Sequence, residues 1–135
     1  MYGMAEETDV KGTLSGQSIL IVEDEALLAL DLHQTLREAG ASLLAAISLE
    51  DALELLPYAQ IDAAVLDINL GGPDCAAVCA ALSRRSIPFI FYTAEAKAEL
   101  VGAWPNAPVV LKPDPPVRRM VDLLAALVSA AKTTS

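Results

Sequence analysis

Six side chains that could share one chemical site lie at the ends of four apolar runs. Glu23, Asp24 and Glu25 follow SILIV, Asp67 follows AAVL, Thr93 ends IPFIFYT and Lys112 ends PVVLK. Carboxylates brought close together repel one another and take up protons unless a cation lies among them. Mg²⁺ prefers oxygen ligands, and proteins usually hold it with one or two carboxylates together with phosphate oxygens. The residues therefore predict a magnesium site, with an ammonium and a hydroxyl that suit phosphate oxygens or an ion-paired carboxylate.

Strands and helices that alternate along the chain would position these side chains. The expected strands are 18–22, 42–47, 62–66, 87–93 and 108–112, and the expected helices are 25–39, 48–56, 75–85, 94–102 and 115–131. Strict alternation predicts an α/β fold, a doubly wound five-stranded parallel sheet of the (βα)5 flavodoxin-like type. Its common strand order is 2-1-3-4-5, in which the first and third strands end side by side at the switch point where ligands bind.

Composition sets the broad class of the protein. The length of 135 residues suits one domain, which we expect over residues 18–131, between a flexible N-terminal leader at 1–17 and a C-terminal tail at 132–135. A net charge of −9 argues against non-specific binding to nucleic acid or anionic membranes. The sequence shows neither a membrane-spanning apolar run nor a signal peptide, so we expect a cytoplasmic protein.

The only two cysteines, Cys75 and Cys79, are spaced for one face of a helix rather than for a C-x-x-C redox or zinc motif. We expect both to be small buried side chains.

Four motifs in order, ILIVEDE, VLDINL, FYTA and VLKP, resemble those of a response-regulator receiver domain over residues 18–131. The resemblance implies that Asp67 accepts a phosphoryl group from a sensor histidine kinase. It also implies that Asp24 and Asp67 bind Mg²⁺ with the backbone carbonyl of Asn69, and that Glu23 assists through water. Thr93 and Lys112 would contact the phosphoryl group.

The same resemblance implies a phosphoacceptor rather than an enzyme that turns over an external substrate. Self-phosphorylation and slow autodephosphorylation would be its only reactions. The expected partner is a sensor histidine kinase or a histidine phosphotransfer protein, and a homodimer is allowed. We expect a stand-alone receiver without DNA binding, which signals through protein partners or serves as a phosphate relay or sink.

Two positions depart from the common receiver pattern. Many receivers have Tyr or Phe three residues before the lysine of the fifth strand, where this chain has Val109. PFIFYTAEA partly resembles the tract of the single-domain FAT GUY subclass, which works with HWE-type kinases, but Tyr92 and Ala94 replace its Ala and Gly. Few residues separate Thr93 from Lys112, so the fourth helix should be short or loosely held.

Helix 25–39 has one face that should pack on the sheet and an opposite face with two leucines. The packing stripe consists of Leu28, Leu32, Leu36 and Ala39. Leu27 and Leu30 fall on the other side, and exposed single leucines are often without function. In receivers this helix and the loop after the fifth strand form the kinase-docking face, so the resemblance implies docking at Leu27, Leu30 and Pro115, with Pro116.

Several alternatives remain open at this stage. The acids could merely cap helices while Lys112 neutralises them. A phosphatase of the haloacid dehalogenase type would need a second Asp two residues after Asp67, where this chain has Asn69. A flavodoxin-like carrier would need a Ser/Thr/Gly-rich phosphate loop, but VEDEAL is acidic. A receiver-like module could also bind partners without phosphorylation.

Overall fold

Five parallel strands form one sheet in the order β2-β1-β3-β4-β5, as predicted. The computed structural model describes residues 12–68, 75–112 and 117–134, with the backbone alone at 26–29, 117, 118, 133 and 134. The strands are β1 Ser18–Val22, β2 Ser42–Ala46, β3 Ala63–Leu66, β4 Phe89–Thr93 and β5 Val109–Leu111. The helices are α2 Ala26–Glu38, α3 Leu49–Leu55, α4 Ala76–Arg84, α5 Ala98–Ala103 and α6 Val117–Thr134.

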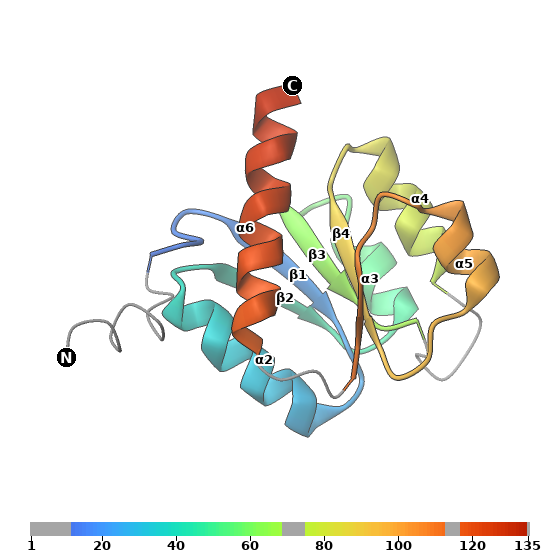
Figure 1. Cartoon of the computed structure of the whole chain (residues 1–135), viewed down its shortest axis with the longest axis horizontal. Helices are drawn as coiled ribbons and strands as arrows, with labels where there is room; N and C mark the ends of the chain where they lie inside the picture. The colour runs from blue at the N-terminus through green and yellow to red at the C-terminus, as the bar shows by residue number, and fades with distance from the viewer. Residues whose placement is uncertain (1–11, 69–74, 113–116, 135) are drawn as a thin grey trace.

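Helices cover both faces of the sheet (Figure 1). Ile19 and Ile21 of β1 lie in a core cluster with Leu36 of α2 and Leu124 of α6. Leu20 of β1 lies in a second cluster, with residues of α3, α4 and α5. Successive strand residues point to opposite faces. The continuous apolar runs of the sequence are therefore what a sheet buried on both sides requires.

The packed part of the chain begins before Ser18, which differs from the expected flexible leader over residues 1–17. Leu14 is fully buried, at 0% exposed, and its backbone N–H donates to the carbonyl of Ala39 at 2.8 Å. Gly40, with φ +95°, brings the end of α2 so close that a Cβ there would lie 2.6 Å from Ser15 Oγ. The turn after α2 therefore needs glycine, both for its backbone conformation and for the close approach.

The other expected element boundaries lie within two residues of the observed ones, except at the start of α5, which begins at Ala98 rather than at residue 94, and near the chain end. Helix α6 continues to Thr134, where a tail was expected from residue 132. Helix α5 has six residues, in agreement with the expected short fourth helix. The Ser48 side chain caps α3 by accepting a hydrogen bond from the Asp51 N–H at 3.1 Å, as the Ser-x-x-acid pattern predicts.

The two cysteines are both 0% exposed, and their sulfurs lie 3.8 Å apart at the start of α4. Their expected role as small buried side chains is confirmed. None of the helices in the described part of the chain combines the length and apolar character needed to cross a membrane.

Candidate functional site

Three polar side chains are buried where strands β1, β3 and β4 end. Glu23 is 6% exposed, Asp67 4% and Thr93 0%. Backbone hydrogen bonds hold the positions: the Asp67 N–H donates to Val22 O at 3.1 Å, and the Glu23 N–H donates to Ala46 O at 3.0 Å. These hydrogen bonds continue the sheet up to the site and fix the backbone positions from which the carboxylates of Glu23 and Asp67 extend.

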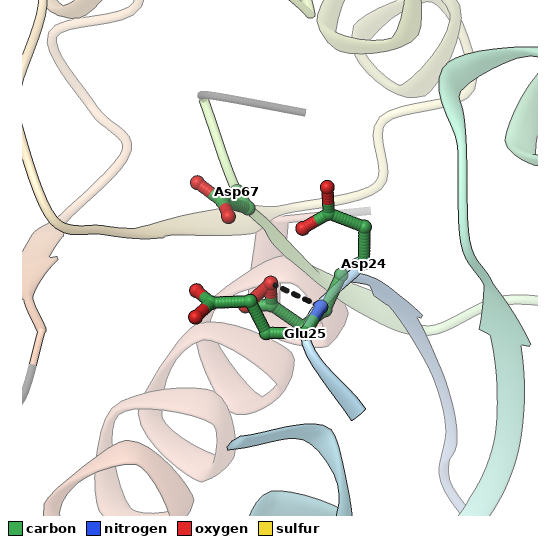
Figure 2. Close-up of side chains that lie close together, drawn as sticks. Asp24, Glu25 and Asp67 are labelled. Atoms are coloured by element: carbon green, nitrogen blue, oxygen red, sulfur yellow. Dashed lines mark hydrogen bonds between the residues drawn. The ribbon is translucent and has the colours of Figure 1, made fainter. Parts of the chain in front are cut away.

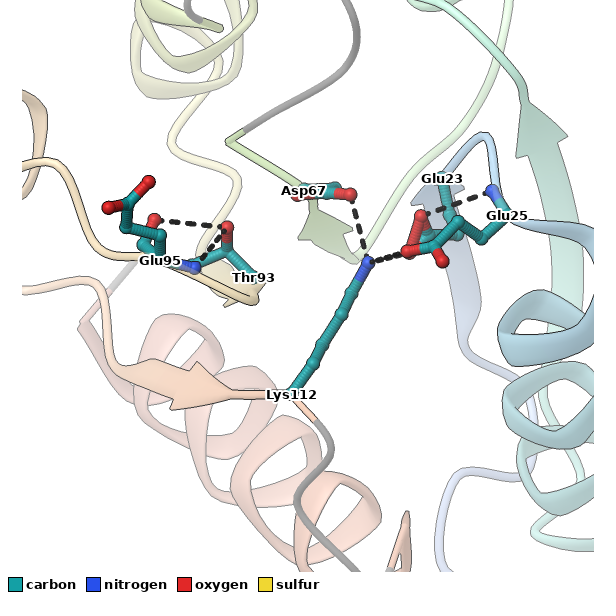
Figure 3. Close-up of polar contacts among 6 residues, drawn as sticks. All are labelled: Glu23, Glu25, Asp67, Thr93, Glu95 and Lys112. Atoms are coloured by element: carbon teal, nitrogen blue, oxygen red, sulfur yellow. Dashed lines mark hydrogen bonds and ion pairs between the residues drawn. The ribbon is translucent and has the colours of Figure 1, made fainter.

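Lys112 connects three carboxylates (Figure 3). Its ammonium donates to Asp67 Oδ2 at 2.9 Å, to Glu25 Oε1 at 3.1 Å and to Glu23 Oε2. The Lys112 side chain is only 5% exposed, so its charge-assisted bonds to the buried Glu23 and Asp67 are largely shielded from water, whereas the Glu25 side chain is 59% exposed. An ammonium has three donors, and three carboxylates accept from this one.

The carboxylates outnumber the single amine. Oxygens of Glu23, Asp24, Glu25 and Asp67 all lie within 4.8 Å of one another. Figure 2 shows Asp24 and Glu25, at the end of β1, beside Asp67. With Lys112 counted, three negative charges remain uncompensated at this site. A compact set of oxygen ligands with excess negative charge fits Mg²⁺.

The ion pair between Lys112 and Glu23 affects the pKa values of both residues. Burial raises the pKa of Glu23, and the neighbouring Asp67 charge raises it further, although Lys112 acts in the opposite direction. Burial alone would lower the pKa of Lys112, but its hydrogen bonds to Glu23, Asp67 and Glu25 raise that pKa overall. Lys112 is therefore a permanent cation, whereas the raised pKa of Glu23 means that this carboxyl takes up a proton at a higher pH than an ordinary glutamate.

The hydroxyl of Thr93 is engaged with the turn that follows β4. Thr93 Oγ1 donates to Glu95 O at 3.2 Å and lies 3.4 Å from the Glu95 N–H, from which it accepts (Figure 3). Contact between Thr93 and a phosphoryl group at Asp67 would require this hydroxyl to change partners.

Comparison with known families identifies the family of this chain. Residues 19–107 match the family model of the response regulator receiver domain. The chain belongs to the response regulator receiver family. Its strand order is the one that the alternation of strands and helices predicted.

Solved receiver structures share the fold. A CheY-like receiver domain protein from Methanospirillum hungatei superposes with a TM-score of 0.79 at 19% identity, over 88% of this chain and 98% of that one. A receiver protein from Sinorhizobium medicae gives a TM-score of 0.77 at 28% identity, over 85% of this chain and 96% of that one.

Two curated relatives from Mycobacterium tuberculosis are named as transcriptional regulatory proteins. TcrA is 33% identical over 102 residues, which cover 67% of this chain and 40% of TcrA. PdtaR is 34% identical over 87 residues, which cover 62% of this chain and 42% of PdtaR. The receiver chain thus spans about two fifths of the length of these relatives, and the absence of DNA binding stays a prediction. The FAT GUY subclass and its HWE-type kinases also stay predictions.

The receiver fold brings Glu23, Asp24, Asp67 and Lys112 together, as the sequence predicted. Asn69 and Pro115 lie outside the described residues, and so does the side chain of Leu27. Leu30 is 63% exposed on α2 and borders a shallow hollow with Gln34, Arg37 and Glu38.

Glu25 was noted at the end of the first strand but was given no role in metal or phosphoryl binding, although it binds Lys112. The only indication in the sequence that Glu25 belongs with these residues was its position directly after Glu23 and Asp24.

Proposed function

We propose that Asp67 accepts a phosphoryl group in a Mg²⁺-dependent reaction. The observation that carries this proposal is the Asp67 carboxylate, 2.9 Å from Lys112 Nζ and within 4.8 Å of the other acids. An ionised Asp67 oxygen attacks phosphorus and forms the new P–O bond, while the bond from phosphorus to the donor breaks and the donor keeps its electron pair. The product is an aspartyl phosphate.

The residues divide the work of binding and charge stabilisation. Glu23, Asp24 and Asp67, with the backbone carbonyl of Asn69, would hold Mg²⁺, which neutralises negative charge on the phosphoryl oxygens when bound. One N–H of the Lys112 ammonium turns from a carboxylate to a phosphoryl oxygen. The Thr93 hydroxyl gives up its hydrogen bonds with Glu95 and donates to a second phosphoryl oxygen. Positioning and electrostatics supply most of such catalysis.

Labelling with a small phosphodonor tests this proposal. Incubation with acetyl phosphate and Mg²⁺ should add one phosphoryl mass to the intact protein, and Asp67→Asn should abolish the addition. Asp62→Asn is a matched control because Asp62 precedes the same strand, where its carboxylate accepts from the Ser18 N–H at 2.7 Å, and Asn can still accept. Unlabelled native protein, or labelling that persists in Asp67→Asn, would contradict phosphoacceptance and favour a module that binds partners without phosphorylation.

We also propose that the phosphoryl group comes from a sensor histidine kinase or a histidine phosphotransfer protein docked over α2. The support is Leu30, a large apolar side chain that is 63% exposed on the helix that begins beside the acids. Burying one leucine contributes about 1.5 to 3 kcal/mol. Onward signalling then runs through protein partners or through transfer of the phosphoryl group as a relay or sink.

The docking surface can be tested apart from the chemistry. Leu30→Asp should slow transfer from a histidine kinase that phosphorylates the native protein, while acetyl phosphate labelling stays intact. The same comparison applies to Leu27→Asp. Equal loss with both donors would indicate a damaged site, and no loss with either would remove α2 from the interface.

A further inference from the structure

We propose that Tyr92 is a positioning residue: its ring supports Lys112 and directs the ammonium toward Asp67 and Glu23. This inference rests on the proposed phosphoryl transfer, because its consequence for function is the rate of that reaction. It concerns an aromatic side chain on β4, the strand that lies between the lysine and the carboxylates.

The strand order forces Lys112 to reach across β4. Lys112 follows β5 at the edge of the sheet, whereas Asp67 follows β3, and β4 lies between them. Neighbouring strands are about 4.8 Å apart, so the backbones of Lys112 and Asp67 are separated by roughly two strand spacings. The Lys112 and Asp67 side chains together span this separation. The β4 residue beneath that path controls what the lysine side chain contacts.

Register and alternation place Tyr92 at that position. Tyr92 pairs with Val110 of β5, and Phe91 pairs with Leu66 of β3, one residue before Asp67. Tyr92 and Val110 lie in the core cluster on the α2 and α6 side of the sheet, whereas Phe91 lies in the cluster on the other side. Tyr92 is thus level with the end of β3 and flanked by the strand that carries Lys112.

The contact itself is observed. Lys112 Nζ lies over the Tyr92 ring, 5.5 Å from its centroid. A cation within about 6 Å of a ring centroid is attracted to the face of the ring, and more strongly where water is excluded. Tyr92 is 6% exposed and the Lys112 side chain 5%, so both partners are shielded. The ring also limits the rotamers of a side chain that otherwise loses much entropy when fixed.

Phosphorylation rates of two Tyr92 variants distinguish the effect of the aromatic ring from the effect of the hydroxyl. With acetyl phosphate and Mg²⁺, Tyr92→Leu should be labelled about tenfold more slowly than the native protein, as expected for loss of a shielded cation–π contact. Tyr92→Phe keeps the ring and should remain within about twofold of the native rate, since the ring face supplies the attraction. A Tyr92→Phe rate as low as that of Tyr92→Leu would overturn the proposal.

Phe91→Leu is the matched control. It also removes a fully buried ring from β4, but on the opposite face of the sheet. A purely structural loss should slow both leucine variants to a similar degree, whereas positioning of Lys112 should slow Tyr92→Leu alone. Equal slowing by Phe91→Leu would contradict the proposal.

A double-mutant cycle with Lys112→Met tests whether Tyr92 acts through the lysine. Tyr92→Leu should add no further slowing in the Lys112→Met background, because the ammonium that the ring supports is gone. The same four proteins should show non-additive melting temperatures without Mg²⁺, with a smaller loss from Tyr92→Leu when Lys112 is absent. If the native protein is not labelled at all, the proposed function fails, and the melting cycle still decides this inference. Additive losses would overturn it.

Discussion

The substitution Asp24→Asn should stabilise the metal-free protein, because Asp24 adds negative charge to a site that already has an excess. Within the part of the chain that the structure describes, Asp24 makes no ion pair, and its carboxylate lies within 4.8 Å of three others. Asparagine has nearly the same shape but no charge. The substitution therefore removes repulsion with little change in packing.

The magnitude follows from these separations. Two unit charges 4.8 Å apart repel by about 0.9 kcal/mol at the dielectric constant of water, the suitable limit for an exposed side chain. Asp24 is repelled by three carboxylates, those of Glu23, Glu25 and Asp67, and the charge of Lys112 offsets one of these repulsions. The net repulsion on Asp24 is then about 2 kcal/mol. Asp24 lies just before α2, whose dipole favours a negative charge by about 0.3 to 1 kcal/mol. The expected gain is therefore about 1 to 2 kcal/mol, or about 3 to 8 °C in melting temperature.

Thermal unfolding at low and high salt would measure this gain. At about 1 M salt the Debye length falls to about 3 Å, so the advantage of Asp24→Asn should shrink. Mg²⁺ should raise the melting temperature of the native protein and have little effect on the variant. Asp122→Asn, on the exposed side of α6, is a control that should change stability by less than about 0.5 kcal/mol. The reasoning is refuted if Asp24→Asn is no more stable than the native protein at low salt without Mg²⁺.

Three further predictions concern the core, the pH dependence and the response to phosphorylation. Leu14→Ala should lower the free energy of unfolding by about 2 to 5 kcal/mol in denaturant titration, while Leu30→Ala should change it little; equal effects would show that Leu14 is not part of the core. Because the pKa of Glu23 is raised, protonation should compete with Mg²⁺ at a higher pH than for an ordinary glutamate. Mg²⁺ affinity should therefore fall as pH is lowered, and Glu23→Gln should weaken this dependence; unchanged affinity down to about pH 5 would count against a shared acidic site. Hydrogen exchange should change within residues 94–106 on phosphorylation, because this segment holds an exposed run and the six-residue helix α5. A change confined to other elements would exclude this segment as the responding one.

The sequence predicted the fold well because its strands are buried on both faces. Runs such as ILIV at 19–22 and AAVL at 63–66 are apolar at every position, which distinguishes parallel strands from half-exposed ones. Strand β4 begins at Phe89 rather than at residue 87. The preceding Ser86 has φ +57°, outside the extended range, and Pro88 has no N–H for the sheet. Leu14 could not be recognised because one apolar residue in a polar segment has no periodicity.

The site was predictable in composition but not in its contacts. Residue type and position after a strand identified Asp67 and Lys112, because the carboxyl ends of parallel strands share one edge of the sheet. The bond from Lys112 to Glu25 depends on how far two long side chains extend, which no spacing in the sequence encodes. The support from Tyr92 depends on strand register, which is set by the assembled sheet.

The buried and exposed carboxylates are neutralised by different partners. Backbone hydrogen bonds within the sheet fix Glu23 and Asp67, so these two cannot move apart to relieve their repulsion. Lys112 reaches both from β5 and compensates them in the absence of metal. Asp24 is exposed and makes no ion pair with any residue that the structure describes, so its charge is left to a cation from solution. Binding of Mg²⁺ beside Asp67 would then reduce the need for Lys112 there and release its ammonium for the incoming phosphoryl oxygens. On this reasoning the excess negative charge lowers the stability of the resting protein but prepares the site for both metal and phosphate.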